Sequence, residues 1–399
     1  MSDGQSPFIK TFILALSQAL GLLNRRIGKH HQRVTHICLN LARALELSNE
    51  DNTTLFYAGL LHDIGAFSAR DKLEIMDFDC PNCYQHCETG FRMLQKNEIL
   101  RPIAEPIRYH HDKYSGPNPS GLVKDEIPLL SQIIHISDRF EVLIQDDKDT
   151  IPQSEQIINK IIQCKGTWFN PKLADALQEI TRSRIFWVGL MPEFVDDILN
   201  EFAPQDDRKL TIDNMVEMAY IFAQVVDYKS HFTKLHSVQV AETSIKIGKA
   251  LGWSKMELKH LLIAGLLHDL GKLATPDEIL EKPAALTPNE YDIIKMHPYF
   301  TYLILSSIPG FDEVAQWTIY HHERLDGKGY PLEVDADNIP QGARIISVAD
   351  RFTALTEDRP YRRKLHADEA LKILKNDVKN NFIDGKILDV LKAVISSRT

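Results

Sequence analysis

Several features are missing from this chain of 399 residues, and each absence excludes a class of protein. No apolar run approaches the roughly 20 residues that span a bilayer. The N-terminus lacks the basic stretch, apolar core and small-residue cleavage site of a signal peptide. The formal net charge of -9 leaves no broad basic face, which binding to long nucleic acids requires. We therefore expect neither a membrane nor a long nucleic acid as a partner.

Cysteine is also scarce, with five residues, an odd count without the spacing of a disulfide scaffold. This usage predicts a reducing, cytoplasmic setting. Cys80 and Cys83 form one Cys-x-x-Cys pair, with Cys87 close behind. That spacing suits zinc or redox chemistry. A single pair is a weak signal: thiols without a function are one interpretation, and a redox influence on the His86 site is the other.

The chain contains an internal repeat. The segment Ala58–Asp63, with the sequence AGLLHD, recurs 206 residues later as Ala264–Asp269. Other rare residues recur in the same order at offsets of 206 to 212. The matched pairs are His30 and His236, His86 and His297, His110 and His321, His111 and His322, and Asp138 and Asp350. Ordered matches of histidine indicate two copies of one domain rather than two unrelated helical domains.

The segment Ala203–Asp207 contains a proline and two adjacent aspartates, which is typical of a linker. We therefore predict two tandem domains, residues 1–204 and 205–399. Helical apolar spacing, as over His236–Leu251, and the scarcity of strict alternation predict an all-α fold. A further helix is expected over Met256–Leu267, with Gly271 as its stop signal. Residues 133–136 and 345–348 are expected to be buried helix rather than strand.

The second copy carries five histidines and two aspartates that are candidate metal ligands. These are His236, His268, Asp269, His297, His321, His322 and Asp350. Imidazoles and carboxylates suit divalent manganese, iron or zinc. Because His268 and Asp269 are adjacent, the aspartate could bridge two ions while the histidine holds one. Such a pair of ions could activate water and hold phosphoryl oxygens for in-line attack.

Three segments of the second copy closely resemble the HD-GYP family of the HD phosphohydrolase superfamily. They are HDLGK at His268–Lys272, the pair His297–Pro298, and HHERLDGKGYP at His321–Pro331. The resemblance covers roughly residues 215–382. It implies a helical fold, a cluster of two or three metal ions, commonly iron or manganese, and hydrolysis of cyclic dinucleotides. It also places the family's metal ligands on the seven residues named above.

The same resemblance assigns catalytic roles to Asp269 and Lys272. A lysine there could neutralise phosphate charge and support the leaving oxygen. Four residues are assigned to substrate binding: Arg359, Arg362, Tyr330 and Lys328. For the two arginines a solvated helix end is the alternative, and for the Gly-Tyr-Pro loop a purely structural turn. Members with three metals carry a glutamate where this chain has Phe232, so two metals are expected.

The first copy keeps a full set of candidate ligands, a second metal cluster formed by His30, His62, Asp63, His86, His110, His111 and Asp138. Ala66 stands where the second copy has Lys272. The Gly-Tyr-Pro loop and the arginine pair have no counterpart. We expect a metal-loaded domain that is regulatory or catalytically weak. A fold that binds no metal, or a separate activity on small phosphates, are the alternatives.

The predicted function is a metal-dependent phosphodiesterase that opens a cyclic dinucleotide to a linear one. The tandem arrangement resembles that of some bacterial 3'3'-cyclic GMP-AMP (cGAMP) phosphodiesterases, and cyclic di-GMP is the usual substrate of the family, so base preference stays open. A cyclic-dinucleotide receptor without turnover and a mononucleotide phosphohydrolase are the alternatives. Apolar helix faces could support a homodimer, although burial in a core explains them equally well.

Overall fold

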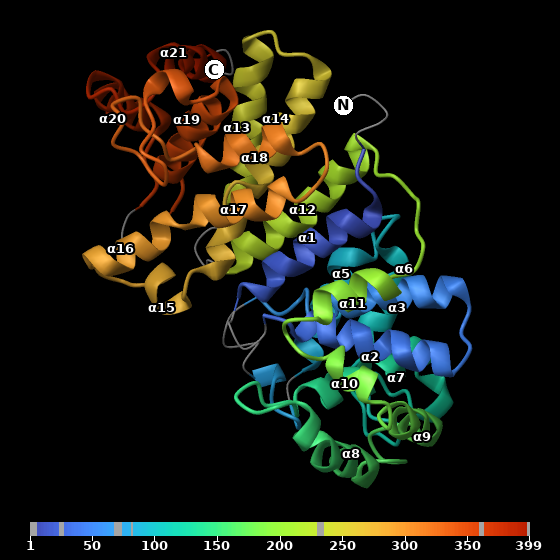
Figure 1. Ribbon diagram of the computed structural model, residues 1–399. Helices are drawn as coiled ribbons and strands as arrows, with labels where there is room; N and C mark the ends of the chain where they lie inside the picture. The colour runs from blue at the N-terminus through green and yellow to red at the C-terminus, as the bar shows by residue number, and fades with distance from the viewer. Residues whose placement is uncertain are drawn as a thin grey trace. The chain divides into compact units, whose positions relative to one another are not determined.

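The structure is a computed structural model, and it is built of helices (Figure 1). It describes residues 6–23, 28–67, 74–80, 83–229, 235–358 and 363–396. Within these ranges no strand forms beyond isolated bridges. The predicted all-α class is therefore confirmed. Among the same residues, no helix combines the length and apolar character that crossing a bilayer requires.

The chain divides into two compact units. The N-terminal unit is Leu20–Asp207, and the C-terminal unit joins Met1–Ala19 to Arg208–Thr399. The sequence had assigned the first residues to the N-terminal domain, whereas they cluster with the C-terminal unit. Backbone hydrogen bonds explain this: Ile9 N–H donates to the Arg208 carbonyl at 3.1 Å, and Leu210 N–H donates to the Pro7 carbonyl at 2.9 Å. A linker sequence indicates where one domain ends and the next begins. It does not indicate with which domain a terminal helix packs.

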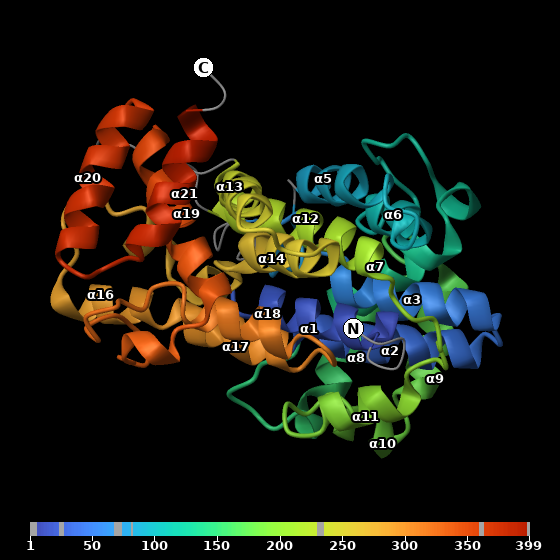
Figure 2. The ribbon, with the colours of Figure 1, turned by 90° about the horizontal axis from the view of Figure 1, so that it is seen from above.

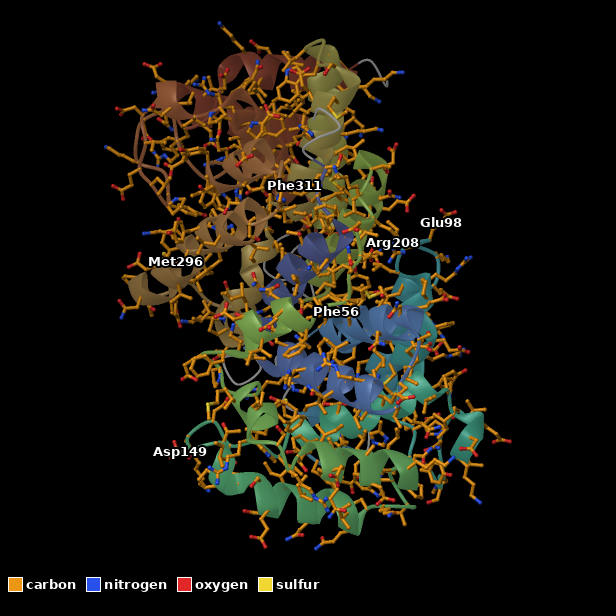
Figure 3. The ribbon with its side chains drawn as sticks, turned by 45° about the vertical axis from the view of Figure 1, so that its right-hand side comes forward. Phe56, Glu98, Asp149, Arg208, Met296 and Phe311 are labelled. Atoms are coloured by element: carbon orange, nitrogen blue, oxygen red, sulfur yellow. A yellow bond between two sulfur atoms is a disulfide. The ribbon has the colours of Figure 1, made fainter. Side chains whose placement is uncertain are left out.

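The helices of the N-terminal unit are α2 (His30–Ala44), α3 (Asn49–Leu61), α5 (Tyr84–Leu94), α6 (Arg101–Arg108), η2 (Lys124–Glu126), α7 (Leu129–Glu141), η3 (Ile151–Gln153), α8 (Ser154–Gln163), α9 (Pro171–Ile180), α10 (Arg184–Val188) and α11 (Val195–Phe202). Helix α2 packs against α3 and α7. Phe56 of α3, labelled in Figure 3, is fully buried in this core.

The helices of the C-terminal unit are α1 (Ile9–Gly21, whose last residues lie past the division), α12 (Ile212–Lys229), α13 (His236–Ala250), α14 (Lys255–Leu267), η4 (Leu270–Ala274), α15 (Asp277–Leu280), α16 (Pro288–Lys295), α17 (His297–Ser306), α18 (Asp312–Ile319), η5 (Ala336–Asn338), α19 (Gln341–Thr356), α20 (Ala367–Lys379) and α21 (Gly385–Ser396). Helix α13 packs against α14 and α19, and α19, α20 and α21 lie side by side (Figures 1 and 2). Phe311 (Figure 3) meets Phe12 of α1 edge-on, with ring centroids 5.7 Å apart.

Most local predictions agree with these helices. Residues 133–136 lie in α7 and residues 345–348 in α19, so both are buried helix as expected. Gly271 is not the helix stop, because α14 already ends at Leu267 and Gly271 lies within η4. The structure joins Cys80 and Cys83 by a disulfide, although the cysteine usage predicted a reducing setting. Their Cα atoms are 5.7 Å apart, a separation that a disulfide spans.

Candidate metal centre

Close helix packing brings the first two histidines of the C-terminal unit together. Helix α14 begins at a capping box, in which the Ser254 hydroxyl accepts from Glu257 N–H and the Glu257 carboxylate accepts from Ser254 N–H. Near its end, Gly265 faces α13, where an added Cβ would lie 2.7 Å from the Ala241 Cα. The absence of a side chain at this position lets α13 and α14 approach. His236 and His268 therefore come to lie with ring centroids 5.6 Å apart.

A second glycine brings α17 to the same place. An added Cβ on Gly271 would lie 2.1 Å from the His297 carbonyl oxygen, so only glycine fits. The Thr301 hydroxyl accepts from Gly271 N–H at 2.8 Å and donates to the His268 carbonyl at 3.1 Å. This pair of bonds ties η4 to α17. The function of Gly271 is thus close contact with His297 rather than helix termination.

Three histidines of the C-terminal unit share one orientation. Each donates from Nδ1 to the carbonyl oxygen three residues earlier: His268 to Gly265 at 2.7 Å, His297 to Ile294 at 2.7 Å, and His321 to Thr318 at 2.5 Å. This bond fixes the tautomer and leaves Nε2 as a bare acceptor. Within the described residues, all three Nε2 atoms are buried and make no hydrogen bond. Buried bare acceptors that converge form a donor set suited to a cation.

Asp269 lies between two groups of histidines. Its Oδ2 is 3.3 Å from His268 Nε2 and 4.0 Å from His236 Nε2. Its Oδ1 is 3.2 Å from His297 Nε2 and 3.9 Å from His321 Nε2. Although burial alone would raise the pKa of this carboxyl, the neighbouring His268 and Lys272 hold it well below its usual range. One carboxylate with its two oxygens facing different imidazole groups is the arrangement of a bridging ligand.

Asp350 and its neighbours complete the cluster. Asp350 Oδ1 is 3.1 Å from His236 Nε2, and Oδ2 is 4.0 Å from His322 Nδ1. The other nitrogen of His236, Nδ1, is 3.1 Å from Glu357 Oε2. Burial would lower the pKa of His236, but hydrogen bonds with Asp350 and Glu357 raise it to about 10. Burial lowers the pKa of His321 to about 3, which keeps that ring in the neutral form that ligates metals.

The seven predicted ligands of the C-terminal unit therefore meet in two adjoining groups. Their candidate ligand atoms lie within 4.8 Å of one another in each group: Asp269, His297, His321 and His322 in one, and His236, His268 and Asp350 in the other. This donor set of imidazoles and carboxylates fits divalent ions. Phe232, on which the expectation of two ions rests, lies outside the described residues.

Lys272 projects from η4 beside the cluster. Its Nζ donates to Asp269 Oδ2 at 2.5 Å, and the side chain is about a quarter exposed. Lys229 anchors the η4 turn, because its buried Nζ donates to the Leu273 carbonyl at 2.6 Å. Burial lowers the pKa of Lys229 to about 8, an effect that Asp277 opposes. A cation thus stands at the open side of the cluster.

The Gly-Tyr-Pro loop forms one wall of the site. The buried Glu323 carboxylate accepts from backbone N–H groups that include Leu332 at 2.7 Å and Glu333 at 3.1 Å, which folds the loop back. The Tyr330 ring lies 4.8 Å from the His322 ring, so this predicted substrate residue borders the cluster. The Lys328 side chain is exposed. The other two predicted substrate residues, Arg359 and Arg362, lie outside the described residues.

The N-terminal unit repeats the arrangement. An added Cβ on Gly59 would lie 2.7 Å from the Thr35 hydroxyl, and one on Gly65 would lie 2.1 Å from the His86 carbonyl. His62 Nδ1 donates to the Gly59 carbonyl at 2.8 Å. The predicted residues, joined by Cys87, again fall into close groups, which are His86, Cys87, His110 and His111; His30, His62 and Asp63; and His62, His110 and Asp138.

Asp63 takes the place that Asp269 has in the other unit. Its Oδ2 is 3.6 Å from His62 Nε2 and 3.7 Å from His30 Nε2, and its Oδ1 is 3.4 Å from His86 Nε2. The surroundings differ in charge. Arg139 is buried and donates to Asp138 Oδ2 at 2.7 Å. Its counterpart Arg351 instead pairs with Asp377 at 3.3 Å.

Sequence reasoning missed three side chains that belong to these clusters. Glu357 and Glu141 contact the Nδ1 atoms of His236 and His30. They lie seven residues after Asp350 but only three after Asp138, so alignment of the repeats could not pair them. Cys87, the third, was considered only for a redox influence on the His86 site and not as a ligand. Its position directly after His86 was the available signal.

Comparison with known proteins agrees with this architecture. The family model described as "HD domain" matches residues 15–173 and 221–387, one match for each copy. The 3'3'-cGAMP-specific phosphodiesterase 1 of Vibrio cholerae is 32% identical over 91% of this chain and 86% of its own length. Phosphodiesterase 3 of the same organism and specificity is 27% identical over 99% of this chain and 96% of its own length.

Matches to other relatives are shorter. The cyclic di-GMP phosphodiesterase of Thermotoga maritima is 34% identical over 41% of this chain and 45% of its own length. Among solved structures, the cyclic GMP-AMP specific phosphodiesterase V-cGAP3 of Vibrio cholerae covers 98% of both chains, with a TM-score of 0.69 and 24% identity, a likeness of fold. The resemblance inferred from the motifs is confirmed, and the chain belongs to the HD domain family.

Proposed function

We propose that this chain is a metal-dependent phosphodiesterase that hydrolyses 3'3'-cGAMP to a linear dinucleotide in its C-terminal unit. The observation that carries the proposal is Asp269, which presents one oxygen to each of two imidazole groups beside Lys272. Two divalent ions in such a site, iron or manganese as the family resemblance implies, would supply an activated water and polarise phosphoryl oxygens.

Side chains of the chain itself would position the substrate and neutralise its phosphate charge. Lys272 is placed to meet a phosphate oxygen and to stabilise negative charge as the leaving oxygen departs. Tyr330 offers an aromatic face next to His322 that a nucleotide can contact. Arg359 and Arg362 are proposed as further phosphate contacts. Because the whole chain carries a net charge of -9, recognition of an anionic substrate has to rest on such local cations.

Base preference follows from the extent of the similarities. Two relatives matched over nine-tenths or more of this chain are both named as specific for 3'3'-cGAMP. Relatives named as cyclic di-GMP phosphodiesterases are matched over less than half of it, as is one further relative named for 3'3'-cGAMP. The tandem architecture therefore favours cGAMP over cyclic di-GMP.

We propose a regulatory, metal-holding role for the N-terminal unit. It keeps the histidine and aspartate cluster, whereas Ala66 leaves it without a cation at the position of Lys272. The Gly-Tyr-Pro sequence is likewise replaced, by residues 113–118. This unit has metal ligands but lacks the groups that would bind the phosphates of the substrate. That combination favours a metal centre with a structural or regulatory role over one that hydrolyses the same substrate.

A direct assay tests the function. Full-length protein loaded with manganese or ferrous iron is incubated side by side with 3'3'-cGAMP, cyclic di-GMP and cyclic di-AMP, and products are separated by chromatography. We expect linear dinucleotide, fastest from 3'3'-cGAMP, and no product after chelation. Binding without product would show a receptor instead. Product from mononucleotides alone would show a different phosphohydrolase, and faster cleavage of cyclic di-GMP would overturn the base preference.

A further inference from the structure

Cys87 lies inside the histidine cluster of the N-terminal unit. It is on α5 directly after His86, and it is 1% exposed. Its Sγ is 3.6 Å from His86 Nε2 and 3.5 Å from His110 Nδ1. With His111, these residues offer ligand atoms that all lie within 4.8 Å of one another. A sulfur atom is therefore part of this group.

Two distances between ligand atoms of this group match edges of a metal tetrahedron. Zinc binds sulfur at ~2.3 Å and imidazole nitrogen at ~2.0–2.1 Å, so ligand atoms around one ion are ~3.6 Å apart for a sulfur–nitrogen pair and ~3.4 Å for a nitrogen pair. The observed separations are 3.6 Å from Cys87 Sγ to His86 Nε2 and 3.4 Å from His86 Nε2 to His110 Nε2.

Hydrogen bonding leaves room for a cation at this place. His110 Nδ1 donates to the Ile107 carbonyl at 2.6 Å, so its Nε2 is the bare acceptor of that tautomer. Among the described residues, His111 Nε2 is buried without a hydrogen-bond partner. Buried nitrogens of this kind are stabilised by a bound ion. Two independent features of the cluster, the edge lengths and the bare nitrogen, thus point to a metal.

The C-terminal unit has no equivalent sulfur. Pro298 follows His297 where Cys87 follows His86, and all five cysteines lie between residues 38 and 164. We propose that Cys87 is a thiolate ligand of a metal ion in the N-terminal unit, and that this centre prefers zinc or another thiophilic divalent ion. The site of the C-terminal unit, built of nitrogen and oxygen ligands, lacks the thiolate that would give this preference.

Binding has a defined proton balance. In the metal-free state the Cys87 thiol donates to the Cys83 carbonyl, with sulfur and oxygen 3.2 Å apart. Formation of the sulfur–metal bond breaks the sulfur–hydrogen bond and releases that proton to solvent. The histidines bind in their neutral form and release none. No oxidant or other reactant takes part.

Cobalt substitution tests the proposal in the full-length protein. Because the C-terminal unit contains no cysteine, a thiolate-to-cobalt charge-transfer band in the near ultraviolet reports on the N-terminal unit alone. We expect this band in the wild type and its loss in Cys87→Ser. Two matched controls, Cys164→Ser and the double variant Cys80→Ser with Cys83→Ser, should keep it. Zinc affinity should fall in Cys87→Ser by at least ~10–100-fold, the loss caused by removing even an outer-shell partner.

Absence of the band in the cobalt-loaded wild type, or its persistence in Cys87→Ser, overturns the proposal. If Cys87→Ser does not fold, alkylation of the wild type gives a second answer. Zinc should protect Cys87 from alkylation relative to chelated protein, and equal labelling in both samples contradicts ligation. Neither measurement uses phosphodiesterase activity, so failure here leaves the proposed function standing, and failure of the activity assay leaves this proposal standing.

Discussion

The two units hold the same cluster in different surroundings. In both, a glycine on one helix lets a partner helix approach, and an aspartate presents its two oxygens to different histidines. The C-terminal cluster is bordered by Lys272 and by the Gly-Tyr-Pro loop. The N-terminal cluster has Ala66 in place of the lysine, Arg139 bonded to one of its aspartates, and a thiol among its histidines.

We propose that this difference separates a unit that holds a metal ion from a unit that also uses one for catalysis. The ligands require only that helix ends converge, which the repeated glycines and helix caps secure in both units. Catalysis requires in addition a cation and a substrate wall on the open side of the cluster. The two arginines differ in the same way. Arg139 forms an ion pair with the cluster residue Asp138, whereas its counterpart Arg351 forms an ion pair with Asp377.

The largest expected effect comes from the bridging aspartates. Asp269→Asn should lower kcat/KM by about three powers of ten or more, because bound metals contribute several kcal/mol to the transition state and each 1.36 kcal/mol is tenfold. Asp63→Asn should lower it far less, because the N-terminal cluster has Ala66 in place of Lys272 and is proposed not to turn over the substrate. Steady-state assays with 3'3'-cGAMP measure both. Equal losses would contradict the assignment of catalysis to the C-terminal unit.

The next largest effect concerns the lysine that the N-terminal unit lacks. Lys272→Met should lower kcat by ~10²–10³-fold, the usual loss when one group that stabilises developing negative charge is removed. Metal content, measured by elemental analysis, should not change. Lys259→Met is the matched control, because Lys259 pairs with Asp213 near the start of α14, on the surface. A Lys272 variant with full activity would remove the chemical distinction between the units.

A smaller effect should appear in both units alike. Glu357→Gln and Glu141→Gln remove the carboxylates on His236 and His30, and each should weaken metal binding of its own unit by ~10–100-fold. Metal-dependent activity reports on the first unit and the cobalt–thiolate band on the second. Glu179→Gln, at an exposed ion pair with Arg182, is the control. An effect confined to one unit would show that the clusters are not built alike.

The smallest effect tests the repeated helix starts. The Ser48 hydroxyl accepts from Asp51 N–H at 3.0 Å, and the Ser254 hydroxyl accepts from Glu257 N–H at 3.3 Å. Either serine changed to alanine should lower the free energy of unfolding by ~1 kcal/mol. The loss should be greater at Ser48, whose hydroxyl also donates to Asp51 Oδ2 at 2.7 Å, whereas alanine at position 254 keeps the backbone N–H that donates to Glu257 at 2.7 Å. Thermal melts of chelated protein would show this, and a larger loss at Ser254 would contradict it.

Much of the site was predictable because the candidate ligands recur at matched positions in both copies of the repeat. All fourteen predicted ligands lie in the two clusters. The helical state of residues 345–348 was also expected, because burial over a short apolar run suits a helix that leads into Asp350. The supporting carboxylates were not predictable, since Glu141 and Glu357 occupy different positions along their helices and reach the same histidine atom only in three dimensions.

The sequence by itself determined the repeat, the helical class and the identity of the ligands, because these depend on residue type, order and spacing. Tertiary structure decided which atoms meet. It assigned α1 to the C-terminal unit through backbone bonds, gave Gly271 a contact with His297 in place of a helix stop, and put Cys87 among histidines. The reason is that such contacts join residues far apart in the chain, whose distance is set by packing rather than by local pattern.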